Sequence, residues 1–185
     1  NVPPLSNVPL DINAPEYNPD KARALLKEAG AEGFDLELMA HDVAHIAKTA
    51  ESYAADLQAV GINAVAKATE DGLWIERWVD RDFQMANSAS ISFMDPDPRS
   101  RGIGSKDNTG YENPKITELL DKGSALSDPI ERGKLYSEAW NIYLNEGAVM
   151  VAVMAAPYVV AMSKRLHGFP MFPEQQQRWE SAWVD

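Results

Sequence analysis

Three segments of the chain place apolar residues at helical spacing, and each begins at an Asx-Pro pair. These pairs are Asn18-Pro19, Asn113-Pro114 and Asp128-Pro129. The Asn or Asp side chain accepts a hydrogen bond from a free N–H at the helix start, and proline suits the first helical position because no donor is needed there. The apolar positions that follow are Ala22, Leu25, Leu26, Ala29, Ile116, Leu119, Leu120, Tyr136, Ala139, Trp140, Tyr143 and Leu144. The pattern predicts three helices, of which the first stops at Gly30 and the third at Gly147.

Between the first two of these helices, the pattern predicts two strands and a crossover helix. Apolar residues alternate with acidic ones from Phe34 to Leu38, which indicates a half-buried strand, and residues 62–68 predict a second strand. The helical stripe between them consists of Ile46, Ala50, Tyr53, Leu57 and Val60 and is closed by Gly61. Two strands joined by a helix of about 17 residues pair in parallel with a right-handed connection.

A short helix with Leu73, Trp74 and Trp78 is expected next, and both tryptophans are expected in the core. A tight turn at residues 80–82 then leads to a strand that starts at Phe83. These pieces extend the same α/β pattern.

The remaining segments carry little regular pattern. Residues 94–112 are rich in Asp, Pro, Gly and Ser and predict a long loop, a kind of segment that is usually functional. The apolar run 147–162 contains Pro157 and is short for a membrane span, so it predicts two buried strands instead. Four large aromatic side chains in residues 164–185 need a surface to pack against.

The composition of the chain argues against several classes of function. A formal net charge of −11 argues against nucleic acid, since binding phosphates requires a basic face. The chain has no cysteine, which excludes disulfides, thiolate metal sites and a cysteine nucleophile. We also find no P-loop, no G-x-G-x-x-G and no G-x-S-x-G pattern.

Five motifs, in their order along the chain, carry a family resemblance. They are Tyr17 to Gly30 (YNPDKARALLKEAG), Ala55 to Ile62 (ADLQAVGI), Asp95-Pro96-Asp97, Gly110 to Pro114 (GYENP) and Ser163 to Phe169 (SKRLHGF). In this order they resemble the family 5 extracellular solute-binding proteins, the peptide-, nickel- and opine-binding class. The match extends over nearly the whole chain.

The resemblance implies an α/β fold, namely the C-terminal lobe of a type II periplasmic-binding-protein-like fold with a mixed sheet flanked by helices. It implies an extended lead-in at residues 1–17, a second-lobe core at residues 18–156, and a tail at residues 157–185 that would cross back to a first lobe outside this chain. Such proteins close on a solute by hinge motion, without turnover, and deliver it to the transmembrane subunits of an ABC permease. We expect no cofactor, no nucleic acid partner and no membrane span. The expected location is the periplasm, or the cell surface through a lipid anchor.

The expected ligand contacts lie at a strand end, in the long loop and after the first strand. They are Ser88, Ala89, Ser90, Ile91, Ser92, Asp95, Asp97, Tyr111 and His41. His41 is included because ligands in open α/β sheets bind beyond the carboxyl ends of strands. Tyr111 offers a ring and a hydroxyl at low entropy cost.

Three alternatives remain open. His41 and His45 have the spacing of a metal pair, but there is no obvious third ligand and the pair lies at a helix start. Asp95 and Asp97 could act as a general acid and base in a hydrolase, whereas Asp and Pro also simply shape turns. A ligand-sensing module on the same fold is the third alternative.

One departure from the family bears on the ligand. In peptide-binding members, a tryptophan and an aspartate precede the D-P-D element, and the aspartate pairs with the α-ammonium of the peptide. An ungapped alignment on Asp95 places these positions at Ala89 and Ser92. Serine is neutral, so we expect no charge-assisted recognition of a free amino terminus at this position.

Overall fold

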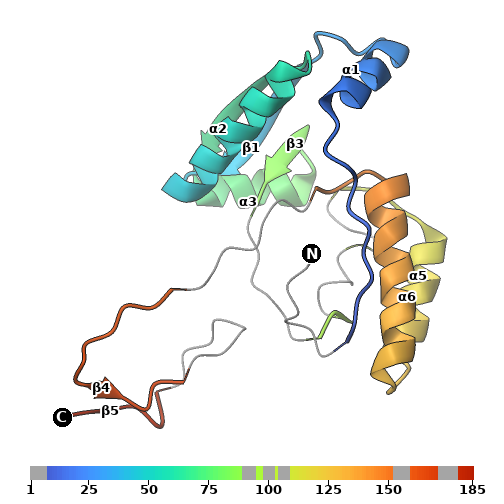
Figure 1. Ribbon diagram of the computed structural model, residues 1–185. Coiled ribbons are helices and arrows are strands. Elements are labelled where there is room, and N and C mark those ends of the chain that lie inside the picture. The colour runs from blue at the N-terminus through green and yellow to red at the C-terminus, as the bar shows by residue number, and fades with distance from the viewer. Residues whose placement is uncertain (1–7, 89–94, 98–102, 104–108, 152–158, 171–178) are drawn as a thin grey trace. The chain divides into compact units, whose positions relative to one another are not determined.

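The computed structural model describes residues 8–88, 95–97, 103, 109–151, 159–170 and 179–185. The chain divides into two units, and we describe each by itself. One unit is residues 16–90, with α1 Pro19–Glu28, β1 Asp35–His41, α2 Ala44–Ala59, β2 Asn63–Thr69, α3 Asp71–Asp80 and β3 Met85–Asn87 (Figure 1). The other unit is residues 1–15 and 91–185, with α5 Pro114–Ser124, α6 Pro129–Asn141, the π-helix η2 Ile142–Glu146, β4 Leu166–His167 and β5 Trp183–Val184.

The three predicted Asx-Pro helix starts are confirmed. The side chain of Asn18 accepts a hydrogen bond from the N–H of Lys21 at 2.9 Å, and proline occupies the first turn of all three helices. Asn113 and Asp128 cap α5 and α6 in the same way. The third helix reaches Gly147 as predicted, although its last turn is a π-helix.

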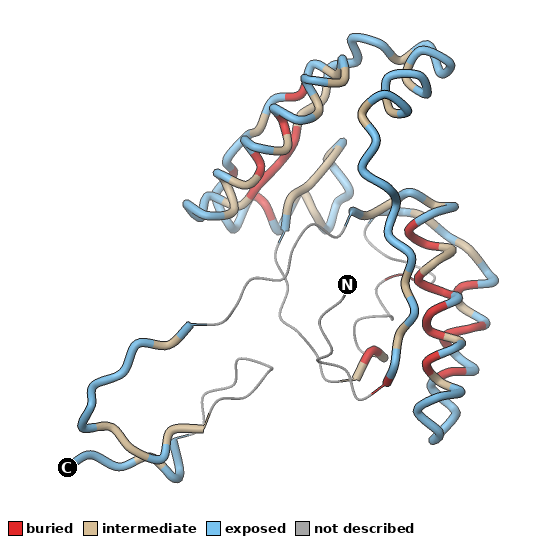
Figure 2. Tube along the Cα trace, viewed as in Figure 1, coloured by how far each residue is buried: buried red, intermediate tan, exposed pale blue. Residues whose placement is uncertain are grey.

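The sheet in residues 16–90 is parallel, as the sequence predicts. The strand order is β2-β1-β3, and β1 pairs with β2 over seven residues. β1 pairs with β3 from Leu38 to Ala40. Because β1 lies in the middle, its residues 38–40 are buried on both faces, whereas the sequence predicted a half-buried strand (Figure 2).

The two helices that follow β1 and β2 cover opposite faces of β1. Leu38 and Ala40 pack with Ala50 of α2 in one hydrophobic cluster. Alternate residues of a strand point to opposite faces, and Glu37 and His41 contact α3 through Arg77 and Trp74. The predicted core position of Trp74 is confirmed, and the ring of Trp78 stacks on it at 5.1 Å between centroids.

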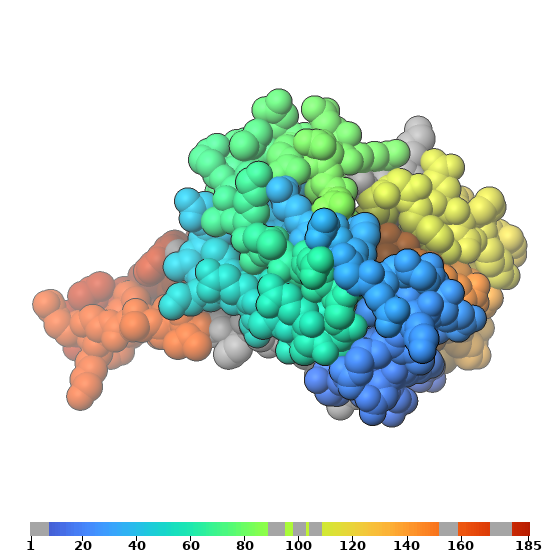
Figure 3. Space-filling model, turned by 90° about the horizontal axis from the view of Figure 1, so that it is seen from above, coloured from blue at the N-terminus to red at the C-terminus, as the bar shows by residue number. Residues whose placement is uncertain are grey.

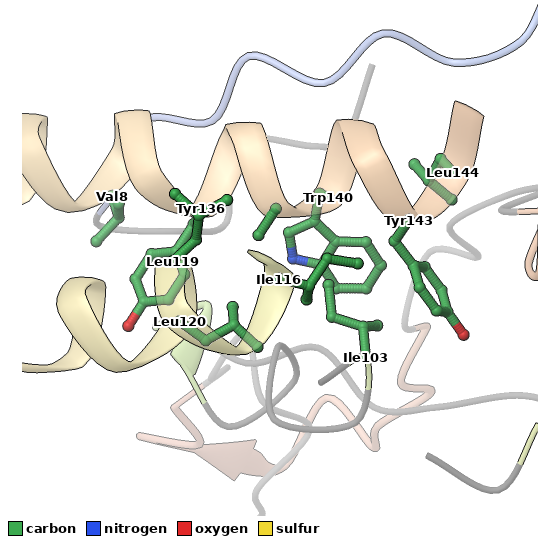
Figure 4. Packing of buried hydrophobic residues seen from close by; sticks show 10 residues of the cluster. Val8, Ile103, Ile116, Leu119, Leu120, Tyr136, Trp140, Tyr143 and Leu144 are labelled. Atoms are coloured by element: carbon green, nitrogen blue, oxygen red, sulfur yellow. The ribbon is translucent and has the colours of Figure 1, made fainter. Parts of the chain in front are cut away.

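In the other unit, α5 and α6 lie side by side and form the main core. Tyr136, Trp140 and Tyr143 project from one side of this contact toward Ile116, Leu119 and Leu120 of α5, and Val8 and Ile103 complete the cluster (Figure 4). Gly123 permits the close approach, because a Cβ there would lie 3.1 Å from the ring of Tyr136. Tyr136 is fully buried.

The described part of the lead-in forms no helix or strand, and its residues Asp11 and Asn13 dock on α6. Ser137, Asn141 and Asn145 are spaced four residues apart and bond to the backbone of Asp11 and Asn13. Four residues of an α-helix advance about 6 Å along the helix axis, and two residues of an extended chain advance about 6.6 Å. The two distances nearly match. Successive helical turns therefore bind alternate residues of the extended segment.

The apolar run 147–162 does not form the two strands that the sequence predicted, as far as its described residues 147–151 and 159–162 show. Val151 is 71% exposed and Val159 is 81% exposed. A strand is stabilised by pairing in a sheet, and neither of these segments is paired with another described segment. No helix in the described ranges is long and apolar enough to cross a membrane.

The described tail residues, orange to red in Figure 3, form a small antiparallel pair, β4 with β5 (Figure 1). The ring of His167 stacks on Trp183 at 4.3 Å between centroids, and Phe169 lies 4.8 Å from Trp179. The aromatic side chains therefore pack partly on each other, while Trp179 and Trp183 stay more than half exposed.

Candidate ligand site

The carboxyl edge of the parallel sheet is one candidate site. The strand order β2-β1-β3 means that the connections from β1 and from β2 run to opposite sides of β1, so the order reverses between β1 and β3. In open α/β sheets, ligands bind at the carboxyl ends of strands at such a reversal. Here β1 ends at His41, and Ser88 follows the last residue of β3.

His41 is held in a defined orientation at this edge. Its Nδ1 lies 2.7 Å from Oδ1 of Asp71, in the first turn of α3. Its ring stacks on Trp74, with centroids 3.9 Å apart and planes 24° apart. The side chain of His41 is 19% exposed, so it is packed but still accessible.

The aromatic stack continues beyond Trp74 to Trp78 and Phe83. Trp78 follows Trp74, and Phe83 lies 5.0 Å from Trp78. On the same face, Arg77 donates to Oε1 of Glu37 at 2.8 Å. This bond from Arg77 and a further one from Lys67 hold the pKa of the Glu37 carboxyl below its usual value.

The predicted loop residues fall into two groups. Ser88 is exposed at the end of β3. Ala89, Ser90, Ile91 and Ser92 lie outside the described residues. Their predicted contact with a ligand stays a prediction.

Asp95 and Asp97 lie against α6. The carboxylate of Asp95 accepts hydrogen bonds from Nη1 and Nη2 of Arg132 at 2.8 and 2.9 Å, and also from the N–H of Asp97. The hydroxyl of Tyr136 donates to Oδ1 of Asp97 at 2.9 Å. The hydrogen bonds from Arg132 lower the pKa of Asp95 against the opposing effect of burial. An aspartate kept ionised in this way suits an anchor for the turn better than a general acid.

Tyr111 is half-buried at the end of the long loop. Its hydroxyl accepts a hydrogen bond from Nδ2 of Asn113 at 3.2 Å, while Oδ1 of Asn113 caps α5. Its ring meets Tyr143 edge-on. A Cβ at Gly147 would come within 2.8 Å of the Tyr111 ring, so only glycine leaves room for it.

Sequence reasoning missed three residues that organise these sites: Arg132, Asp71 and Trp74 as the partner of His41. The signal for Arg132 was a cation four residues before Tyr136 on the face that carries the core of α6. No comparable signal linked His41 to Asp71, which is 30 residues away.

The metal alternative finds no support in the described ranges, where no three His, Asp or Glu side chains are grouped to hold an ion. His45 is exposed, and the Nδ1 of His41 is engaged by Asp71.

An open groove of about 980 Å³ runs along α6 and the docked lead-in. It contains none of the predicted site residues, and several of its polar side chains already bind the lead-in backbone. These polar side chains of the groove therefore serve the docking of the lead-in.

Comparisons with known proteins agree with this architecture. The family model of the bacterial extracellular solute-binding proteins, family 5 Middle, matches residues 1–111. The chain is 29% identical over 140 residues to di/tripeptide-binding protein 4 of Pseudomonas aeruginosa, covering 69% of this chain and 26% of that protein. It is 30% identical over 186 residues to the glutathione-binding protein of Escherichia coli K12, covering 90% of this chain and 35% of that protein.

A solved structure matches over the full chain. The dipeptide-binding protein of Pseudoalteromonas sp. SM9913 in complex with Met-Leu superposes with a TM-score of 0.76 at 21% identity, covering 100% of this chain and 39% of that one. This likeness shows the α/β fold of a solute-binding protein. The chain spans between 26% and 35% of the length of the two curated relatives. Because the family model matches more than half of its residues, the chain belongs to the bacterial extracellular solute-binding proteins, family 5.

Proposed function

We propose that the full-length protein captures a small solute outside the cytoplasm and delivers it to an ABC-type import permease, without chemical turnover. Family membership is the observation that carries this proposal. The relatives are named for di- and tripeptides and for glutathione, so a peptide-like solute is the proposed ligand class. The proposed location is the periplasm, or the cell surface through a lipid anchor.

The proposed ligand contacts are His41, Tyr111 and the segment from Ser88 to Ser92. We assign Asp95 and Asp97 a supporting role at the end of this segment. Their carboxylates are bound by Arg132 and Tyr136, which fixes the turn that follows it. The lobe boundaries at residues 17 and 156 are part of the same proposal.

Native mass spectrometry of the full-length protein, purified from its own cells without denaturation, tests the proposal. We expect a bound small molecule whose mass is unchanged after prolonged incubation. Release of a product that depends on substrate and is blocked by Asp95→Asn would instead favour the hydrolase. Genes for a permease and an ATPase beside this one would favour import over ligand sensing.

A further inference from the structure

A hydrogen bond to Asp71 fixes one of the two ring nitrogens of His41. A carboxylate is only an acceptor, so the 2.7 Å contact with Asp71 places a proton on Nδ1 of His41. In the neutral ring, the lone pair then lies on Nε2. None of the described residues is hydrogen-bonded to Nε2, although the ring is well packed.

A second observation concerns the ring that stacks on His41. The Nε1–H of Trp74, in the ring stacked on His41, is buried and has no hydrogen-bond partner among the described residues. Buried polar groups in proteins nearly always have a partner, because an unpaired one is costly. The ring that supports His41 therefore carries an unpaired N–H of its own.

The negative charge near His41 bears on the kind of solute group that could bind there. Asp71 contacts its ring, and Asp42, which follows it in the chain, is exposed. Two carboxylates favour a solute group that carries N–H donors, and they disfavour a solute carboxylate.

We propose that His41 Nε2 accepts a hydrogen bond from an N–H group of the solute, with Asp71 fixing the ring tautomer and Trp74 supporting the ring. This inference rests on the proposed function and assigns one chemical role within it. The stack from Trp74 to Phe83 holds the imidazole at the strand-order reversal, so the acceptor is in place before the solute arrives.

Two substitutions separate the roles of the two ring nitrogens. The amide of His41→Asn reaches the position of Nδ1 and can still pair with Asp71, but it offers nothing at Nε2. The amide of His41→Gln reaches the position of Nε2 and retains an acceptor there. His45→Asn is the matched control, because His45 is an exposed histidine four residues further along.

The experiment titrates full-length wild type and variants with Met-Leu, with glutathione and with the small molecules released from the purified protein. We expect His41→Asn to weaken binding about tenfold, His41→Gln to weaken it less, and His45→Asn to leave it unchanged. In nitrogen-15 spectra of the wild type, the Nε2 signal of His41 should move when the solute binds. The chain has three histidines, so the His41→Asn spectrum assigns the signal.

The outcomes separate this inference from the proposed function. If His41→Asn binds a probe as tightly as the wild type does, the proposed role of His41 is wrong. The same holds if Nε2 of His41 in the wild type is protonated, or if its signal does not move when the solute binds. Neither outcome affects the proposed function. Wild-type protein that binds no probe and releases no small molecule contradicts the proposed function, and this inference fails with it. Circular dichroism of each variant shows whether a loss of binding reflects a loss of folding.

Discussion

Arg132 on α6 binds both carboxylate oxygens of Asp95, at 2.8 and 2.9 Å, across 37 residues of sequence. The same guanidinium donates to the carbonyl of Gly123 and to the hydroxyl of Tyr136. Arg132 thus ties the D-P-D turn to both helices of the core. Asp95, which the sequence offered as a ligand contact or as one of a catalytic pair, binds Arg132 of α6 through both carboxylate oxygens.

Replacing Arg132 with lysine should destabilise the protein by about 1 kcal/mol, because lysine cannot make two parallel bonds to one carboxylate. The estimate is modest because the Asp95 side chain is 42% exposed and solvent screens the pair. Urea unfolding of Arg132→Lys, Asp95→Asn and the double variant measures the coupling. Additive effects of the two single substitutions would show that the contact contributes nothing.

The Asp95–Arg132 contact also predicts acid sensitivity. Arg132 lowers the pKa of Asp95 in the folded protein, so the contact stabilises the fold at pH values above the ordinary value of 3.8. This contribution is lost as the pH falls below that value and the carboxylate takes up a proton. The pKa of Glu37 is lowered by Arg77 and Lys67, so protonation of Glu37 also lowers the stability of the folded protein as the pH falls.

Stability of the wild type should therefore fall more steeply between about pH 4 and about pH 2 than that of Asp95→Asn. Urea midpoints measured across this range test the difference. Asp121→Asn, on the exposed side of α5, is the control and should retain the wild-type slope. Equal slopes for all three proteins would contradict the prediction.

Gly133 of α6 should be intolerant of alanine. A Cβ at this position would lie 2.1 Å from the carbonyl oxygen of Pro9, so the lead-in must move away. Exposing Val8 and breaking the bonds to Asp11 and Asn13 should cost about 2 kcal/mol, despite the better helix propensity of alanine.

Hydrogen exchange at the amides of Asp11 and Asn13, together with urea unfolding, measures this effect. Gly72→Ala is the matched control, since its Cβ would meet only the flexible carboxylate of Glu70, at 3.1 Å. We expect that substitution to be nearly neutral. Protected amides in Gly133→Ala would show that the lead-in docks in another way.

The neutral residue at position 92 predicts how peptides bind. The full-length protein should bind N-acetylated dipeptides within about tenfold of the free dipeptides, because Ser92 cannot form the charge-assisted bond that a carboxylate would make. Calorimetry with paired free and acetylated dipeptides tests this. A strong preference for the free amine that Ser92→Ala does not change, and that Asp95→Asn or Asp97→Asn removes, would place the carboxylate at one of those aspartates.

Several features of this protein could be predicted from sequence because they depend on neighbours along the chain. The Asx-Pro caps at Asn18, Asn113 and Asp128 use donors two or three residues away, so the local sequence is sufficient. The parallel pairing of β1 with β2 follows from the length of the helix between them. The order of motifs identified the family without any structure.

The supporting contacts of the candidate sites were decided only by the tertiary structure. Asp71 meets His41 from 30 residues away, and Ser137 binds the N–H of Asp11 from 126 residues away. Within the apolar run, the described residues 147–151 and 159–162 do not form the predicted strands, because hydrophobicity alone does not provide a strand with a partner. Contacts of this kind depend on which distant surfaces the fold brings together, and side-chain spacing along one element carries no information about that.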